Sequence, residues 1–185
     1  MKVIIVGVPG AGKTSVANGL ENYGWTVVTF GTFMFEIAKK EYGITHRDHM
    51  RIKIKADEYK KLQEKAAKEI AKLNGKIVID THLSIKKPEG YYPGLPENVL
   101  KKLQPDAMVL VEADGKEIDK RREKDAGERI RSGNSTEHQQ VNRYFAAACS
   151  VISRMPVSFV KNKQGKLNET VEKIADFLKK VGEDG

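Results

Sequence analysis

Residues 7–14 read GVPGAGKT and come directly after the apolar run VIIV at residues 3–6. Glycines let a backbone come close to phosphate oxygens, so that successive N–H groups form a nest for an anion. A helix is expected to begin at Thr14, and its positive N-terminal end would face the same phosphates. Lys13 is placed to reach the β- and γ-phosphates, and the Thr14 hydroxyl is placed to bind Mg²⁺. The stretch therefore predicts a phosphate-binding loop between a buried strand and a helix.

Asp80 closes the apolar run KIVID at residues 76–80. An acidic residue at the tip of such a strand matches the second metal-binding element of P-loop proteins, so Asp80 is predicted to hold Mg²⁺ through water. The alternative is that Asp80 only caps the loop that follows. The four histidines have no spacing typical of a metal site, and one cysteine cannot form a zinc clasp. His82 lies two residues after Asp80 and is therefore the one histidine with a candidate role at the site.

Short β-rich apolar runs alternate along the chain with charged amphipathic stretches. The expected strands are residues 3–6, 27–30, 77–79, 108–111 and 157–160. The expected helices are near residues 14–22, 33–42, 53–73, 97–103, 116–124, 137–153 and 167–181. This alternation predicts an α/β fold, a parallel sheet with helices on both faces. No repeat, linker or low-complexity tract marks a second domain, so residues 1–185 are predicted to form one domain.

Two segments interrupt the alternation. Residues 81–96 hold three prolines and two glycines just after a strand, which predicts a loop. Residues 125–136 combine glycines and polar residues with arginines, which is typical of a mobile surface segment. Ligands bind at the carboxyl ends of the strands in such sheets, so both segments are candidates for substrate contacts.

Arginines gather in the second half of the chain. Five of them lie between residues 121 and 143: Arg121, Arg122, Arg129, Arg131 and Arg143. A kinase whose acceptor is itself a phosphate must bring two anions together and neutralise the charge that develops between them. Arginine suits this task because its planar guanidinium binds phosphate through two hydrogen bonds. Acidic residues are interspersed here, so any single arginine could instead belong to a solvated helix face.

A second basic cluster, HRDHMRIKIK, covers residues 46–55. Arg47 and Arg51 are four residues apart and would share one face of a helix. Thr32 precedes the expected helix over residues 33–42. Its hydroxyl either caps that helix or contacts a nucleotide base.

The composition limits the partners and the compartment. The 185 residues carry a net charge of +8, which favours anionic partners such as nucleotides, nucleic acid or acidic lipid. No apolar run approaches the roughly 20 residues that span a membrane. The single cysteine, Cys149, is expected to be buried in a helix and excludes a disulfide framework within the chain. A soluble cytoplasmic protein is therefore expected.

Taken together, these motifs resemble those of the archaeal-type adenylate kinases. The resemblance covers nearly the whole chain. It is carried by GVPGAGKT, by TFGT at residues 29–32, by RDHMR at 47–51 and by DTHLSIKKPEGYYPGLP at 80–96. It implies a P-loop three-layer fold with a five-stranded parallel sheet, a homotrimer, and reversible phosphoryl transfer from ATP to AMP with Mg²⁺, giving two ADP.

The resemblance also implies roles by position. The ATP side would comprise Gly7, Val8, Pro9, Gly10, Ala11, Gly12, Lys13, Thr14 and Ser15. The AMP side would comprise Gly31, Thr32, Arg47, Arg51 and His82, within a nucleoside-monophosphate region at about 31–55. The catalytic residues would be Lys13, Arg122, Arg131 and Arg143, with a short lid at about 122–133.

Residues 80–84 depart from the better-known bacterial and eukaryotic adenylate kinases. Those enzymes carry an arginine in the sequence Asp-Gly-Phe-Pro-Arg at this place, whereas this chain has none. The partner of the AMP phosphate therefore stays open among Lys86, Arg47 and Arg51. Two further readings also stay open: another small-molecule kinase of the same fold, and a nucleotide-dependent RNA-binding or ribosome-assembly factor. The chain has no RNA-recognition motif, so nucleic acid is the less favoured partner.

Overall fold

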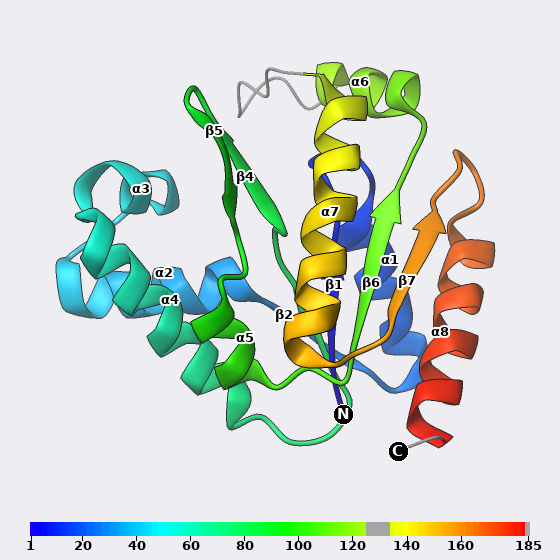
Figure 1. Cartoon of the computed structure of the whole chain (residues 1–185), viewed down its shortest axis with the longest axis horizontal. Helices are drawn as coiled ribbons and strands as arrows, with labels where there is room; N and C mark the ends of the chain where they lie inside the picture. The colour runs from blue at the N-terminus through cyan, green and yellow to red at the C-terminus, as the bar shows by residue number, and fades with distance from the viewer. Residues whose placement is uncertain (125–133, 184–185) are drawn as a thin grey trace.

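The structure is a computed structural model that describes residues 1–124 and 134–183, with the backbone alone at positions 48, 51 and 124. Its centre is a sheet of five parallel strands in the order β2-β3-β1-β6-β7 (Figure 1). The strands are β1 (Lys2–Val6), β2 (Thr26–Thr29), β3 (Ile77–Asp80), β6 (Ala107–Glu112) and β7 (Val157–Lys161). All five lie where the sequence predicts them, and the predicted fold class is confirmed.

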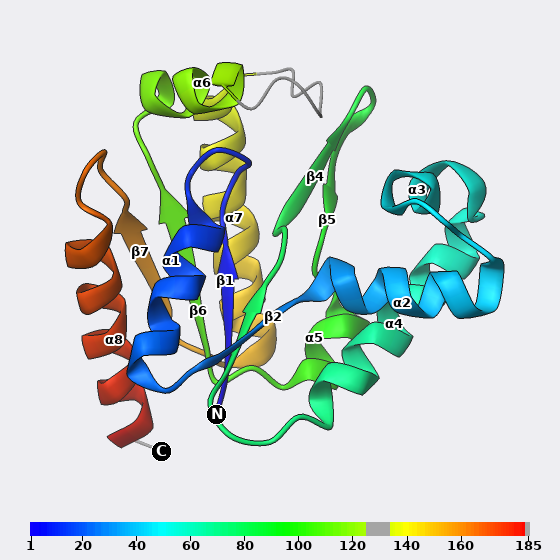
Figure 2. The same cartoon turned by 180° about the vertical axis from the view of Figure 1, so that it is seen from behind.

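Helices cover both faces of this sheet (Figures 1 and 2). One face carries α1 (Lys13–Gly19) and α8 (Leu167–Glu183). The other carries α2 (Phe30–Tyr42), α4 (Ala56–Ala71), α5 (Glu97–Leu103) and α7 (Ser135–Ser153). The short helix α3 (Met50–Lys53), the helix α6 (Gly115–Lys124) and the 3₁₀ turns η1 (Leu20–Tyr23) and η2 (Arg47–His49) complete the described helices.

The central strands are apolar on both sides because helices pack against both faces. In β1, Ile4 belongs to the core under α2, α4, α5 and α7, whereas Val3 and Ile5 belong to the core under α1 and α8. Successive side chains of a strand point to opposite faces, so an unbroken apolar run supplies both cores. The second core also receives Val171 and Ile174 from α8.

The carboxyl ends of the parallel strands meet at one edge of the sheet. Asp80, the last residue of β3, lies beside Ile5 of β1 in the strand register. The segment after β1 therefore emerges next to the Asp80 carboxylate. Helix α6 lies at this edge, and so does a separate two-stranded ribbon (Figure 2).

That ribbon contradicts the prediction of an irregular loop at residues 81–96. It is an antiparallel hairpin of β4 (Ser84–Lys87) and β5 (Gly90–Pro93). Lys87 pairs with Gly90, so Pro88 and Glu89 form a two-residue turn, and Gly90 has the positive φ of 140° that glycine allows. The prolines lie in the turn, at the end of β5 and after it, where they interrupt no central strand.

Three predicted boundaries are also wrong. Helix α2 begins at Phe30 after Thr29, so Thr32 lies in its first turn and does not cap it. The helix expected near 53–73 is divided, because Ile54 has an extended backbone between α3 and α4. Residues 135 and 136 begin α7, whose N-cap Asn134 accepts hydrogen bonds from the backbone N–H groups of Thr136 and Glu137 at 3.0 and 3.1 Å. Residues 125–133, which include Arg129, Arg131 and most of the predicted lid, lie outside the described residues.

Candidate active site

The loop at residues 7–12 connects β1 to α1 and has the backbone that its glycines predict. Gly10 and Gly12 have φ angles of 91° and 85°, a region that side chains with a Cβ rarely adopt. The Ala11 N–H donates to the Val8 carbonyl at 3.1 Å, which closes a turn inside the loop. Helix α1 then begins at Lys13, one residue before the predicted start. The loop thus ends at a helix N-terminus, as a phosphate site requires.

Asp80 binds the two functional side chains that follow this loop. Lys13 Nζ lies 2.5 Å from Asp80 Oδ1, and the Thr14 hydroxyl donates to Asp80 Oδ2 at 2.8 Å. The Asp80 side chain is only 3% exposed and that of Lys13 is 13% exposed. This buried ion pair fixes the lysine at the start of α1. The structure therefore brings together Lys13, Thr14 and Asp80, and Asp80 does more than cap the loop that follows it.

Asn162 supports the phosphate loop and was not among the predicted site residues. Its Nδ2 donates to the Ala11 carbonyl at 3.0 Å, and the residue is 6% exposed. Its amide lies where a Cβ at Gly12 would stand, so the asparagine and the glycine fit closely together. The Asn162 N–H also donates to the Glu112 carbonyl of β6 at 2.7 Å. The sequence does contain a hint of this role, because Asn162 is a polar residue directly after the last strand, at the carboxyl edge where ligands bind.

Two arginines of α6 bind the same loop from its other side. Arg122 Nε donates to the Pro9 carbonyl at 2.9 Å, and Arg121 Nη1 donates to the Gly10 carbonyl at 3.2 Å. Arg121 also reaches Gln164, in the segment that follows β7, at 3.1 Å. Arg122 was predicted to be catalytic and to begin the lid; its guanidinium lies against the phosphate loop, and its catalytic role stays a prediction.

Arg143 lies on α7 and forms an ion pair through two hydrogen bonds with Glu112. Its Nε and Nη2 donate to the two carboxylate oxygens of Glu112 at 2.7 and 2.6 Å. This contact raises the pKa of the Arg143 guanidinium above its usual value. The Arg143 side chain is 58% exposed and that of Glu112 is 13% exposed, so solvent screens the pair only from the arginine side. Arg143 thus lies at the carboxyl end of β6, and its predicted place between two phosphates stays a prediction.

The first of the residues predicted to bind AMP lie directly after β2, at the start of α2. Gly31 lies in the first turn of α2, where an added Cβ would overlap the Arg47 guanidinium. The absence of a side chain at Gly31 therefore makes room for Arg47, and two predicted AMP residues are in contact. Thr32 is exposed next to them, and His82 is half-buried just after β3. The backbone of Arg51 lies in α3, but its side chain is outside the described part.

A buried polar cluster joins the hairpin to α7. The Ser84 hydroxyl donates to Asn142 Oδ1 at 2.5 Å and lies 2.9 Å from His138 Nε2. With the hydroxyl proton directed at Asn142, His138 Nε2 must be the donor in the second contact. Burial lowers the pKa of His138, and the charge of Arg122 lowers it further. The Tyr91 hydroxyl adds a hydrogen bond to Glu137 at 3.0 Å. His138 therefore takes part in the contact between the hairpin and α7.

The described residues contain no group of three or more His, Cys, Asp or Glu side chains that could hold a metal ion. Within the same residues, no helix is both long enough and apolar enough to cross a membrane. Cys149 is buried in α7 as predicted, and burial raises the pKa of its thiol to about 11.

Comparisons with known proteins agree with this arrangement. A family model described as "AAA domain" matches residues 6–140. The chain is 48% identical over 172 residues to an adenylate kinase of Pyrobaculum aerophilum, covering 90% of this chain and 86% of the relative. It is 43% identical to an adenylate kinase of Methanocaldococcus jannaschii, covering 96% and 97% of the two chains. The adenylate kinase of Thermoplasma volcanium is 42% identical, with 97% of this chain and all of the relative covered.

Solved structures with the same fold are more distant in sequence. Shikimate kinase from Acinetobacter baumannii has a TM-score of 0.60 and 15% identity, covering 96% of this chain and 92% of that one. Shikimate kinase from Aquifex aeolicus has a TM-score of 0.56 and 17% identity over the full length of both chains. At this identity the likeness establishes a shared P-loop kinase fold and no more. Since the sequence relatives extend over nearly the whole chain, this protein is a phosphotransferase that belongs to the adenylate kinase family.

Proposed function

We propose that this enzyme transfers the terminal phosphoryl group of ATP to AMP, reversibly and with Mg²⁺, giving two molecules of ADP. One observation carries the proposal: both sets of predicted nucleotide contacts lie at the carboxyl edge of one sheet. The phosphate loop and Lys13 follow β1, whereas Gly31 and Arg47 follow β2. Phosphoryl transfer needs two phosphates aligned at one place, with little covalent chemistry from the protein.

On the ATP side, the N–H groups of the phosphate loop and the Lys13 ammonium bind the phosphates. Lys13 forms its ion pair with Asp80 at 2.5 Å, which keeps the ammonium at the start of α1. When phosphates arrive, Lys13 shares its charge between them and Asp80. Arg122, held at 2.9 Å from the Pro9 carbonyl, adds a second positive charge beside the loop. These groups neutralise negative charge that grows on the transferring phosphoryl group.

Thr14 and Asp80 fit a magnesium ion that arrives with the nucleotide. Magnesium keeps several waters and binds phosphate oxygens with only one or two protein oxygens. Thr14 Oγ1 and Asp80 Oδ2 are 2.8 Å apart, so a hydroxyl ligand and a carboxylate that binds metal water are available together. Bound magnesium would neutralise phosphate charge. Thr14 would orient it directly, and Asp80 would orient it through water.

On the AMP side, Arg47 is the best candidate for the phosphate partner among the side chains described. Its guanidinium lies against Gly31, at the start of α2, and can bind a phosphate through two hydrogen bonds. Lys86, on β4 of the hairpin, is the alternative, and its ammonium lies 3.8 Å from the Glu137 carboxylate and 5.3 Å from the Tyr91 ring centre. Thr32 and His82 complete the proposed side, with Arg51 as a further cation.

Arg143 is proposed to reach the transferring phosphoryl only when both nucleotides are bound. It must then exchange Glu112 for phosphate oxygens. The Arg143 side chain is 58% exposed but that of Glu112 is only 13% exposed, so the exchange leaves a largely buried carboxylate without this partner, and the new phosphate contacts must offset that cost. Arg131 and the proposed lid at 122–133 would close over the same place and exclude water.

We also infer that the enzyme is a homotrimer and that α7 contributes to the subunit contact. Tyr144 and Val151 are 66% and 80% exposed and lie two helical turns apart on the same side of α7. Phe159 of β7 is 50% exposed, and the Arg143 guanidinium of α7 lies 5.7 Å from its ring centre. Exposed apolar patches of this kind mark protein contacts. Light scattering should give a trimer for the wild type and a smaller species for Val151→Asp; a wild-type monomer would contradict the inference.

The cytoplasm is the proposed compartment, since the only cysteine of the chain is buried and forms no disulfide. Nucleotides, and not nucleic acid or membrane, are the proposed partners.

The test of function is a coupled assay of ADP formation with ATP, Mg²⁺ and each of the four common nucleoside monophosphates. We expect AMP to give the highest kcat/KM. A preference for another monophosphate would identify a different kinase of this fold. ATP consumption with no monophosphate as acceptor, together with salt-sensitive RNA binding, would favour an RNA-associated factor.

A further inference from the structure

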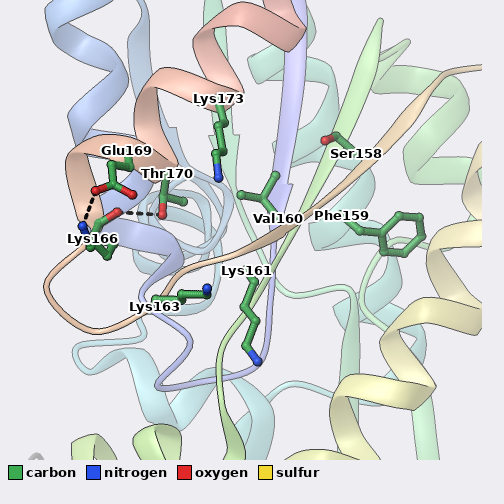
Figure 3. Close-up of a pocket in the computed structure, with 9 residues that line it drawn as sticks. All are labelled: Ser158, Phe159, Val160, Lys161, Lys163, Lys166, Glu169, Thr170 and Lys173. Atoms are coloured by element: carbon green, nitrogen blue, oxygen red, sulfur yellow. Dashed lines mark hydrogen bonds and ion pairs between the residues drawn. The ribbon is translucent and has the colours of Figure 1, made fainter.

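We propose that the cavity between the edge strand β7 and the first half of α8 binds a small phosphate-bearing anion, at a site separate from the phosphate loop (Figure 3). The cavity has a volume of about 310 Å³. That is the lower end of the range for small-molecule sites and suits a ligand the size of pyrophosphate. None of its lining residues belongs to the phosphate loop, to α1 or to α6.

The charges around this cavity are strongly unbalanced. Its lining includes four lysines and a single acidic residue, Glu169. The lysines are Lys161, Lys163, Lys166 and Lys173. Lys166 forms an ion pair with Glu169 at 2.5 Å, whereas the other three have no such pair within the described residues. In Figure 3 the Lys161 side chain extends away from α8, so Lys163 and Lys173 are the two positive charges left to face an anion.

The positions of the lysines make this more than a charged surface. They come from three different segments: the end of β7, the loop after it, and α8. In Figure 3, Lys163 and Lys173 extend into the space between β7 and α8. Lys166, Lys173 and Lys163 all lower the pKa of the Glu169 carboxyl, so their fields meet at one place. That place is the Glu169 carboxylate itself, so an anion in the cavity would share these lysines with Glu169.

Neutral hydrogen-bond donors border the same cavity. Strand β7 pairs only with β6 and is the last strand of the sheet, so the backbone N–H groups of its outer edge have no strand partner. Ser158, half-buried on β7, adds a hydroxyl. Lysine ammonium groups bind phosphate as mobile point charges without the fixed geometry of arginine. The site therefore fits a hydrated inorganic or terminal phosphate group.

The chain segment that carries three of the cavity lysines also contacts the phosphate loop and its neighbour Arg121. The segment between Lys161 and Lys166 contains Asn162, which holds the Ala11 carbonyl, and Gln164, which holds Arg121. An anion that draws these lysines together would restrain that segment. The inference does not depend on which nucleotide the enzyme phosphorylates.

The test is a titration with pyrophosphate at constant ionic strength, followed by the backbone amide resonances of the ¹⁵N-labelled protein. One experiment gives separate amide shifts for residues 158–173, at the cavity, and for residues 8–14, at the phosphate loop. Binding at the two places is therefore distinguished. We expect saturable shifts at 158–173 in the wild type. The double variant Lys163→Ala/Lys173→Ala should weaken that binding by about tenfold, the scale for two exposed charge contacts.

The matched control is Lys179→Ala/Lys180→Ala, which removes the same charge from the end of α8, outside the cavity. It should keep the dissociation constant at 158–173 within about twofold of wild type, because distant exposed charges are screened. Equal weakening in both double variants would mean that only the net charge matters and would overturn the proposal. So would shifts confined to residues 8–14, or shifts at 158–173 that grow linearly without saturation. Both lysines replaced in the test variant are exposed, so the fold should survive, which a melting curve checks.

Discussion

Replacing Asn162 by alanine is the sharpest test of how the phosphate loop is held. Asn162 comes from the segment after β7, yet its amide donates to the Ala11 carbonyl at 3.0 Å and fills the space beside Gly12. Gly12 has a φ of 85°, so this part of the loop has an unusual backbone conformation that depends on its surroundings. The Asn162→Ala variant removes the side-chain amide, so the Ala11 carbonyl loses this hydrogen-bond donor.

The size of the effect follows from burial. A buried acceptor that loses its donor costs about 1–3 kcal/mol. If the loop needs this bond to keep its N–H groups pointed inward, most of that cost appears in ATP binding. A loss of about 1–2 kcal/mol corresponds to roughly 5- to 30-fold weaker binding. Global stability should fall as well, by about 2–4 °C in melting temperature for each kcal/mol.

The assay is the equilibrium dissociation constant for ATP, measured by calorimetry next to the melting temperature. Asn142→Ala is the matched control, since Asn142 is 1% exposed and accepts a hydrogen bond from Ser84 of the hairpin, whereas Asn162 donates to the phosphate loop. It should lower the melting temperature by a similar amount and leave ATP binding within about twofold. ATP binding that is unchanged in Asn162→Ala, or weakened equally in both variants, would refute the argument.

Three further predictions concern the two nucleotide sides. Lys13→Ala should lower kcat by about 10²–10³ without unfolding the protein, because it removes a positioned charge; turnover within threefold of wild type would exclude the phosphate-loop assignment. Asp80→Asn should shift the magnesium titration of the rate more than the ATP affinity, since the metal loses a carboxylate partner; an unchanged magnesium curve would leave Asp80 as an anchor for Lys13 only. Gly31→Ala should raise the KM for AMP by about tenfold while ATP binding and stability hold, because its Cβ displaces the flexible Arg47 guanidinium; an unchanged KM would remove Arg47 from the AMP side.

Much of the fold could be predicted because its signals are local. Each strand of the sheet is a short apolar run, and such runs form strands that are buried on both faces. The phosphate loop could be predicted because glycine, lysine and threonine at this fixed spacing are typical of one loop geometry. Asp80 followed from its place at the end of a strand, where the register brings it beside β1.

What the sequence did not predict depends on contacts between distant segments. Asn162 lies 151 residues from Ala11, and no local pattern joins them. The hairpin at 84–93 was missed because its prolines indicated a loop, while the buried cluster of Ser84, His138 and Asn142 holds it against α7. The ion pair of Arg143 with Glu112 has the same origin, since it joins side chains that are 31 residues apart.

The most direct measurement of the central claim uses ADP as the only nucleotide. With Mg²⁺ present, ³¹P NMR should show ADP converting to ATP and AMP in equal amounts, since the reaction is proposed to be reversible and to need a nucleotide on each side. Lys13→Ala, purified in the same way, controls for contaminating enzymes and should convert ADP at least about 10²-fold more slowly. Release of inorganic phosphate in place of ATP, or no conversion at all by the wild type, would contradict phosphoryl transfer between two bound nucleotides.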